Sequence, residues 1–227
     1  MDWALARRRM VDGQLRPNRI TEARLLAALA EVPRERFVPA ELRPRALADA
    51  DLPLPVPGRV LMQPMSVARL VQSLGVRTGS RALVAASGVG YGAALLARIG
   101  AEVTAVEAEA ALAALGRDLL PEGVRLHVAD PREGWAADAP YDAILVEGGV
   151  ERVPEALEAQ LAEGGRLATV LRRPDRAPVA VLGTRVPGVA SVSYAVTYDL
   201  FTPLLPGFGA APGGGPAAEG AGGFVFA

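Results

Sequence analysis

The residues best suited to bind a cofactor lie in the segment ALVAASGVGYG, positions 82–92. Small and apolar residues lead into Gly88 and Gly90, and a helical pattern begins at Tyr91. A glycine turn between a parallel strand and a helix lets backbone N–H groups approach a ligand at the positive end of the helix dipole. We expect Ser87, Gly88, Gly90 and Tyr91 to bind a cofactor.

Two acidic residues stand at the ends of the next two predicted strands. Glu107 ends the segment EVTAVE, and Asp130 ends the segment GVRLHVAD. A carboxylate at the tip of the second strand is placed to accept hydrogen bonds from both hydroxyls of a ribose. Asp130 is placed to meet the amino group of an adenine. These residues predict an adenosine pocket; the alternative interpretation is a plain tight turn flanked by two solvated strand ends.

Strand and helix patterns alternate between about residues 80 and 170. These elements must position the glycine turn and the two acidic residues. Short apolar runs bounded by turns are separated by helical segments, which is typical of a parallel sheet covered on both faces. The predicted strands are RALVAA, EVTAVE, GVRLHVAD, YDAILVEGG and GRLATVLR, and the helices are YGAALLARIG, AEAALAALGRDLL and VPEALEAQLAEGG. APVAVLGTRV and ASVSYAVTYDLF are further strand candidates. The chain is therefore predicted to have an α/β fold.

Three zones organise the chain. Residues 1–78 are predicted to form an N-terminal helical extension and substrate-side segment, residues 79–205 the core, and residues 206–227 a Gly/Pro-rich tail. In the first zone, Thr21 is the expected N-cap of a helix. A second helix, QPMSVARLVQSLG, is expected to end at Gly75. The final FVFA is a candidate hydrophobic anchor.

The amino-acid composition excludes several kinds of functional site. The 227 residues include no cysteine and no lysine, which excludes disulfides, thiolate zinc sites and lysine Schiff bases. His127, the single histidine, lies in an apolar alternation and is predicted to be a strand residue; no metal site is expected. A net charge of −1 gives no reason to expect nucleic acid or a membrane as a partner. No signal peptide or membrane span is recognised, so a cytoplasmic location is expected.

Several segments resemble the protein-L-isoaspartate O-methyltransferase family between about residues 10 and 204. They are MVDGQLRPNRITEARLLAALAEVPRERFVP, DLPLP, QPMSVARLVQSL, SGVGY, AVE, GWAADAPYDAILVEGGVERVPEALEAQLAEGGRLA and FTPL. The resemblance implies a Rossmann-like methyltransferase fold with a seven-stranded, mostly parallel sheet, and S-adenosyl-L-methionine as cofactor. It implies transfer of a methyl group to the α-carboxylate of L-isoaspartyl residues in proteins or peptides.

Three positions depart from the motifs of that family. Val84 stands where the family has an acidic residue on the first strand, and Ala86 replaces the first glycine of the turn. Ala86 is expected to resist a positive φ because it carries a Cβ. Met62 replaces a serine or threonine that helps hold the substrate carboxylate, and it cannot donate a hydrogen bond. Ser66 is a candidate substitute for that hydroxyl.

These departures leave three functions to weigh. The first is a working carboxyl methyltransferase acting on isoaspartyl substrates. The second keeps the cofactor but methylates another carboxylate, and the third is a non-catalytic homologue that keeps the scaffold as a binding module. The first is preferred as the family's default activity, and the catalytic residue and the oligomeric state are left open.

Overall fold

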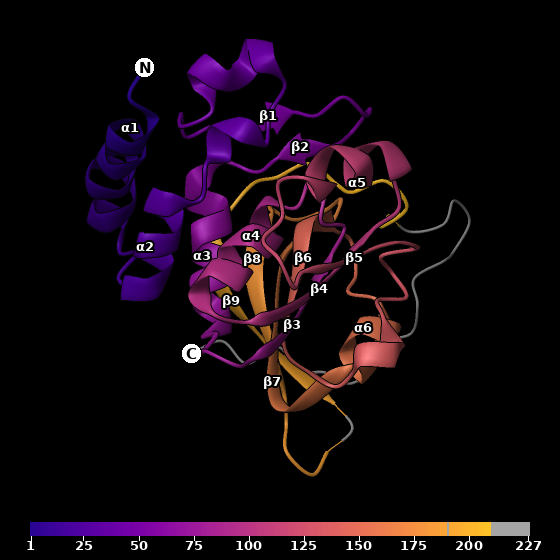
Figure 1. Ribbon diagram of the computed structural model, residues 1–227. Coiled ribbons are helices and arrows are strands. Elements are labelled where there is room, and N and C mark those ends of the chain that lie inside the picture. Colours follow the sequence, from indigo (N-terminus) through magenta and orange to yellow (C-terminus); the bar gives the residue numbers. More distant parts are fainter. Residues whose placement is uncertain (190, 210–227) are drawn as a thin grey trace.

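The computed structural model describes residues 1–189 and 191–209, which form a central sheet with helices on both faces (Figure 1). The sheet has seven strands in the order β5-β4-β3-β6-β7-β8-β9. The five strands from β3 to β7 in chain order run parallel to one another. β8 is antiparallel to β7, and β9 is antiparallel to β8. Their bounds are β3 Arg81–Ala85, β4 Glu102–Glu107, β5 Arg125–Val128, β6 Tyr141–Val150, β7 Leu161–Leu171, β8 Val179–Arg185 and β9 Val192–Asp199. The predicted seven-stranded, mostly parallel α/β fold is confirmed.

The chain order of the strands reverses beside β3. From β3 the chain moves outward through β4 and β5, and it then returns to place β6 on the other side of β3. In open α/β sheets, ligands bind beyond the carboxyl ends of the strands at such a reversal. The ends of β3, β4 and β6 therefore define where a site is expected.

Two hydrophobic clusters lie on the two faces of the sheet. The first joins α3 (Pro64–Leu74) and α4 (Tyr91–Ile99) to the N-terminal helices and to inward residues such as Val84 and Leu145. The second gathers residues of the opposite face around Ile144, together with Leu157 of α6 (Glu155–Ala159). α5 (Ala110–Arg117) packs on β4 and β5. Because the N-terminal region shares a core with the sheet, its position is fixed relative to the strand ends.

The N-terminal region consists of short helical pieces and one small hairpin. α1 spans Trp3–Met10 and α2 spans Ala23–Glu31, with a π-helical turn and three 3-10 turns among residues 11–45. The N-cap of α2 is Glu22, whose side chain accepts a hydrogen bond from the amide of Leu25. The prediction of Thr21 as the cap was wrong, because the longer carboxylate one residue later reaches the free amide of the first turn.

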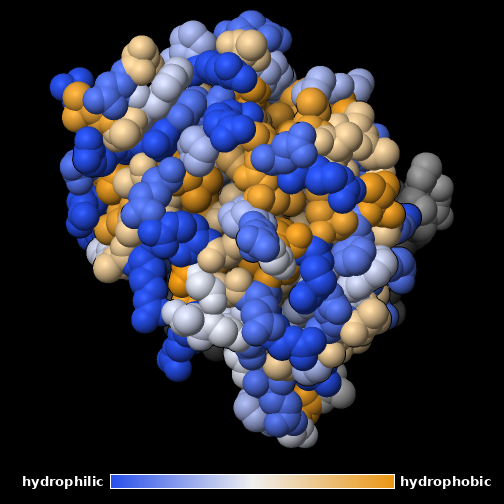
Figure 2. Space-filling view, in the orientation of Figure 1, coloured by the Kyte–Doolittle hydropathy of each residue, from blue (hydrophilic) through white to orange (hydrophobic). Residues whose placement is uncertain are grey.

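The hairpin of β1 (Leu52–Pro53) and β2 (Val60–Leu61) is a separate two-stranded sheet. Within residues 1–189 and 191–209, no helix has the length and apolarity needed to cross a bilayer. Figure 2 shows hydrophilic and hydrophobic residues interspersed on one face, with apolar groups most visible in the upper half, where Figure 1 places β1, β2 and α5.

Two predicted segment boundaries differ from the structure. The predicted helix VPEALEAQLAEGG ends early, because α6 has five residues and β7 begins at Leu161. Gly164 has a φ of 71°, and a Cβ on Gly165 would lie 2.8 Å from backbone oxygens, so these glycines suit a tight extended bend. β5 stops at Val128, which places Asp130 in the following loop. The predicted FVFA anchor and most of the predicted tail lie outside the described residues.

Candidate active site

The glycine turn connects β3 to α4 through residues with left-handed backbone conformations. Gly88 has a φ of 58° and Gly90 a φ of 84°, and Gly90 is the N-cap of α4. Ala86 also adopts a positive φ, 55°. The expectation that Ala86 would resist this conformation was wrong, since the amide of Ser87, bonded to the Val106 carbonyl at 3.1 Å, ties the turn to β4. A non-glycine residue pays roughly 1–2 kcal/mol for this conformation.

Glu107 lies at the end of β4, fully buried against this turn. Its Oε2 accepts a hydrogen bond from the amide of Gly88 at 2.6 Å, and its Oε1 accepts one from the amide of Glu109 at 3.0 Å. The Arg59 guanidinium donates to both oxygens, at 2.5 Å and 2.8 Å. A carboxylate offers about four acceptor positions. Partners within the protein therefore occupy all of them.

A cavity of about 400 Å³ opens beside Glu107, where the sequence predicts an adenosine. The walls of the cavity come from the turn, from the loops after β4 and β5, and from the segment after β9. The lining residues are Arg59, Ala86, Ala108, Glu109, Val128, Ala129, Asp130, Pro131, Arg132, Leu205, Pro206, Gly207 and Phe208. Asp130 therefore lies at this cavity, as its predicted role requires. It pairs with Arg132 at 2.6 Å, and those hydrogen bonds lower the pKa of Asp130 below its ordinary value.

Tyr91 faces away from this cavity, into the core between α4 and the N-terminal region. Its ring meets Phe37 edge-on with centroids 5.3 Å apart, and the Arg34 guanidinium lies 4.9 Å from the ring centroid. Burial raises the pKa of Tyr91 to about 12. The structure therefore brings Ser87, Gly88, Gly90 and Glu107 together at one edge but points the Tyr91 side chain elsewhere.

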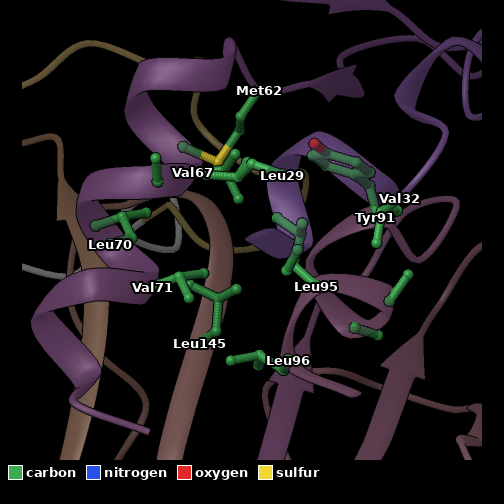
Figure 3. Packing of buried hydrophobic residues seen from close by; sticks show 14 of the residues in the cluster. Leu29, Val32, Met62, Val67, Leu70, Val71, Tyr91, Leu95, Leu96 and Leu145 are labelled. Carbon is green, nitrogen blue, oxygen red and sulfur yellow. The ribbon is translucent and has the colours of Figure 1, made fainter. Parts of the chain in front are cut away.

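Met62 and Ser66, the two candidates for substrate contact, are both buried. The Met62 side chain packs with Leu29 and Val67 in the first hydrophobic cluster (Figure 3). The Met62 carbonyl accepts a hydrogen bond from Arg34 at 2.6 Å. The Ser66 hydroxyl accepts one from the Gln63 side chain at 2.8 Å. Because Ser66 is fully buried, it is poorly placed to replace the family's donor.

Glu147 is a buried acid near the carboxyl end of β6 that was not proposed from the sequence. It approaches Gly92 so closely that a Cβ there would lie 2.7 Å from Oε2. Burial raises the pKa of Glu147 to about 8, against the opposing charges of Arg59 and Arg34. The sequence does contain a signal for Glu147, because it is the single acid within the otherwise apolar run AILVEGG. Its position at the strand reversal makes it a candidate functional residue.

Four buried polar atoms, among others in the described part of the chain, have no hydrogen-bond partner of good geometry. They are Arg34 Nη1, Tyr91 Oη, Glu147 Oε2 and Thr202 Oγ1. Arg34 and Glu147 influence each other's pKa, and burial raises the pKa of Asp51 while Arg34 and Thr202 oppose that rise. Buried polar groups in native proteins are nearly always satisfied. We call these four residues, Arg34, Tyr91, Glu147 and Thr202, the unpaired cluster.

Arg59 was also missed at the sequence level. It follows the proline-rich run DLPLPVPG, which reads only as a loop. His127, by contrast, lies in β5 as predicted, and its ring stacks on Trp135 with centroids 3.7 Å apart.

Comparison with known proteins decides the family. The model of the protein-L-isoaspartate(D-aspartate) O-methyltransferase family matches residues 6–182. The chain belongs to this family. A protein-L-isoaspartate O-methyltransferase of Methylorubrum populi is 43% identical over 210 residues, which cover 91% of this chain and 98% of the relative. One of Koribacter versatilis is 41% identical over 177 residues, covering 76% of this chain and 79% of the relative.

Solved structures agree with the protein-L-isoaspartate(D-aspartate) O-methyltransferase family in fold. A protein-L-isoaspartate O-methyltransferase superposes with a TM-score of 0.77 at 24% identity, covering 89% of this chain and 67% of the other. A putative protein-L-isoaspartate O-methyltransferase from Plasmodium falciparum, solved with S-adenosyl-L-homocysteine, has a TM-score of 0.74 at 18% identity, covering 88% and 97%. At these identities the likeness supports the fold alone.

Proposed function

We propose that the chain is an S-adenosyl-L-methionine-dependent carboxyl O-methyltransferase that acts on L-isoaspartyl residues of damaged proteins. Family membership supports this function. The observation that carries it is the carboxylate of Glu107, held 2.6 Å from the Gly88 amide and beside a cavity of about 400 Å³. A carboxylate, a glycine turn and a cavity at one strand reversal are what a nucleoside cofactor requires.

The residues of this edge fit a nucleoside in shape and type. Glu107 would receive the ribose hydroxyls, and Asp130 lies at the wall where an adenine amino group would be bound. Ser87 Oγ is buried without a hydrogen-bond partner among the described residues, which leaves one free polar group in the turn. The fit holds only after Arg59 releases the oxygens of Glu107, because those oxygens have no acceptor position left.

The proposed chemistry asks little acid–base help from the chain. When bound, S-adenosyl-L-methionine would supply an activated sulfonium methyl group to a carboxylate oxygen of the substrate, and the electron pair of the broken carbon–sulfur bond would stay on sulfur. The chain has to align the substrate carboxylate with the methyl group and to provide an electrostatic environment that accepts an anion. With its pKa at about 8, Glu147 holds a proton at neutral pH and does not repel an anionic substrate. Arg34, buried nearby, contributes positive charge.

Met62 favours a second candidate function, methylation of a different carboxylate. Its thioether stands where the family places a hydroxyl, and the hydroxyl of Ser66 is fully buried. A more apolar reaction edge would accept a carboxylate with an apolar flank more readily than an isoaspartyl peptide.

Calorimetric titration with S-adenosyl-L-homocysteine tests the cofactor, with homocysteine as the control ligand. We expect heat from the first alone; no heat and no thermal shift at millimolar ligand would overturn both enzyme functions. Transfer of labelled methyl to an isoaspartyl peptide, compared with the aspartyl peptide of the same sequence, then tests the substrate. Labelling of neither peptide by a cofactor-binding protein would favour the second candidate. We propose the cytoplasm as the place of action, which cell fractionation tests.

A further inference from the structure

Arg59 lies where a ribose would have to bind. It is the last residue before β2, and its side chain runs from the hairpin down to the end of β4. Its side chain is 5% exposed and that of Glu107 is 0% exposed, so the pair is shielded from solvent. Nη2 of Arg59 also donates to the Ala86 carbonyl at 3.0 Å. One guanidinium therefore binds both the carboxylate and the turn.

The space over the glycine turn is filled by the same hairpin. A Cβ added to Gly88 would lie 3.6 Å from Arg59 Nη2 and 3.5 Å from a methyl of Leu54. The hairpin thus covers the face of the turn on which backbone amides would approach a ligand. Arg59 also forms part of the cavity wall, so its departure would extend the cavity toward Glu107.

We propose that Arg59 is an internal competitor of the cofactor's ribose and sets the affinity of the site. A nucleoside gains Glu107 only when the guanidinium leaves it, because the two sets of donors need the same acceptor positions. This inference rests on the proposed function, since the competing ligand is the cofactor of that reaction. Arg59 acts through Glu107 and is a positioning residue for the cofactor.

The hairpin is built so that Arg59 can leave without breaking the main sheet. Its ladder has two residue pairs, Leu52 with Leu61 and Pro53 with Val60, and it is not hydrogen-bonded into the seven strands. The tip residues 55, 57 and 58 are exposed. Gly58, with a φ of 75°, permits the turn that directs Arg59 inward. A small movement of the tip would carry the guanidinium into solvent.

Replacing Arg59 tests the competition directly. Titration of S-adenosyl-L-homocysteine into Arg59→Met is expected to give a dissociation constant at least tenfold below that of the unmodified protein. Arg7→Met is the matched control: Arg7 forms another buried ion pair, with Glu35, and does not line the cavity. We expect Arg7→Met to lower stability and to leave the dissociation constant within about threefold.

A second measurement uses the unmodified chain and does not require the variant to fold. Arginine side-chain NMR should show slowly exchanging Arg59 Nη protons in the free protein. Saturation with S-adenosyl-L-homocysteine should speed their exchange to that of a solvated arginine. Arg34 is the internal reference, because its hydrogen bonds to the Met62 and Ala46 carbonyls lie apart from the ribose carboxylate and should remain protected.

The outcomes separate this inference from the proposed function. Ligand binding with equal or weaker affinity in Arg59→Met, or protected Arg59 protons in the saturated complex, overturns the competition and leaves the enzyme intact. Failure of both proteins to bind overturns the proposed cofactor, and the competition with it. Binding by Arg59→Met alone supports the competition, but it overturns both enzyme functions for the unmodified chain, which then binds no cofactor.

Discussion

Glu107 and Glu147 are buried acids near the ends of β4 and β6, on either side of β3, and their surroundings differ. Glu107 has a bidentate arginine and two backbone amides. Glu147 is also buried, yet its Oε2 has no partner of good geometry in the described residues, and burial raises its pKa to about 8. The two buried acids therefore differ in the partners that neighbouring segments supply.

Under the proposed function, the strand ends divide into two halves. The half expected to bind the nucleoside is closed by the Arg59–Glu107 ion pair, and the half proposed for the reaction carries the unpaired cluster. A buried, hydrogen-bonded pair is costly to break from one side, whereas unpaired polar atoms are costly as they stand. Ligand binding should therefore break the Arg59–Glu107 hydrogen bonds in the first half. In the second half it should give hydrogen-bond partners to the atoms of the unpaired cluster.

Breaking the ion pair from one side should have the largest effect. Glu107→Leu leaves Arg59 buried without its partner, and we expect the free energy of unfolding to fall by about 3–5 kcal/mol. The double variant Arg59→Met, Glu107→Leu should recover most of this loss. Urea unfolding of both variants measures it. A loss below about 1 kcal/mol in the single variant would mean that Arg59 moves to solvent unaided and that the first half is not closed.

Met62→Ser should lower stability by less than Glu107→Leu does, and it should raise the methyltransferase activity. Removing the buried thioether leaves a cavity in the first hydrophobic cluster, for which we expect a loss of about 2–4 kcal/mol. If the position serves the substrate carboxylate, methylation of an isoaspartyl peptide should rise. Met62→Leu, a volume-conserving control, should lose less than about 1.5 kcal/mol and gain no activity. Unchanged activity in Met62→Ser would separate Met62 from substrate binding.

Glu147 should make the stability of the protein depend on pH. Its pKa is raised from 4.5 to about 8, so in that window the folded chain keeps a proton that the unfolded chain has lost. Stability should therefore fall as pH rises from about 4.5 to about 8, with a slope of up to about 1.4 kcal/mol per pH unit, and level off above it. Denaturant unfolding across pH 5–8 should show a shallower slope in Glu147→Gln. Identical slopes in the two proteins would mean that Glu147 does not carry the extra proton of the folded state.

Tyr91→Phe should have the smallest effect. The hydroxyl has no partner of good geometry in the described part of the structure, so its removal should change the free energy of unfolding by about 1 kcal/mol or less. The ring contacts with Phe37 and Arg34 would remain. Thermal unfolding measures the change. A large loss would show that the Tyr91 hydroxyl is bonded in the folded protein, and the unpaired cluster would be smaller by one member.

Local patterns predicted the sheet well because apolar periodicity and glycines act over a few residues. The parallel core, the helix ending at Gly75 and the strand position of His127 all follow from such short-range signals. Glu107 was placed at a strand end for the same reason, and it is the last residue of β4, whereas Asp130 lies two residues beyond β5 in the wall of the cavity. Their contacts with a cofactor stay predictions.

Long-range pairing explains what sequence patterns did not predict. Arg59 meets Glu107 across 48 residues, and the proline-rich run before it shows a loop without showing where its arginine points. The conformation of Ala86 was mispredicted because intrinsic preference favours negative φ, while the hydrogen bond from Ser87 to β4 and the path of the chain impose the opposite. The shortened α6 has the same origin, since pairing of β7 with β6 overrides helix propensity.

The separateness of the β1–β2 ladder has a consequence for how such a protein can diversify. Residues 53–60 approach the cofactor edge yet contribute nothing to the register of the seven strands. Substitutions at the hairpin's exposed residues 55, 57 and 58 can therefore alter ligand binding without changing the pairing of the seven strands. Those three positions are where selection, or a protein engineer, can change affinity while the buried Leu54 and Arg59 keep the hairpin in place.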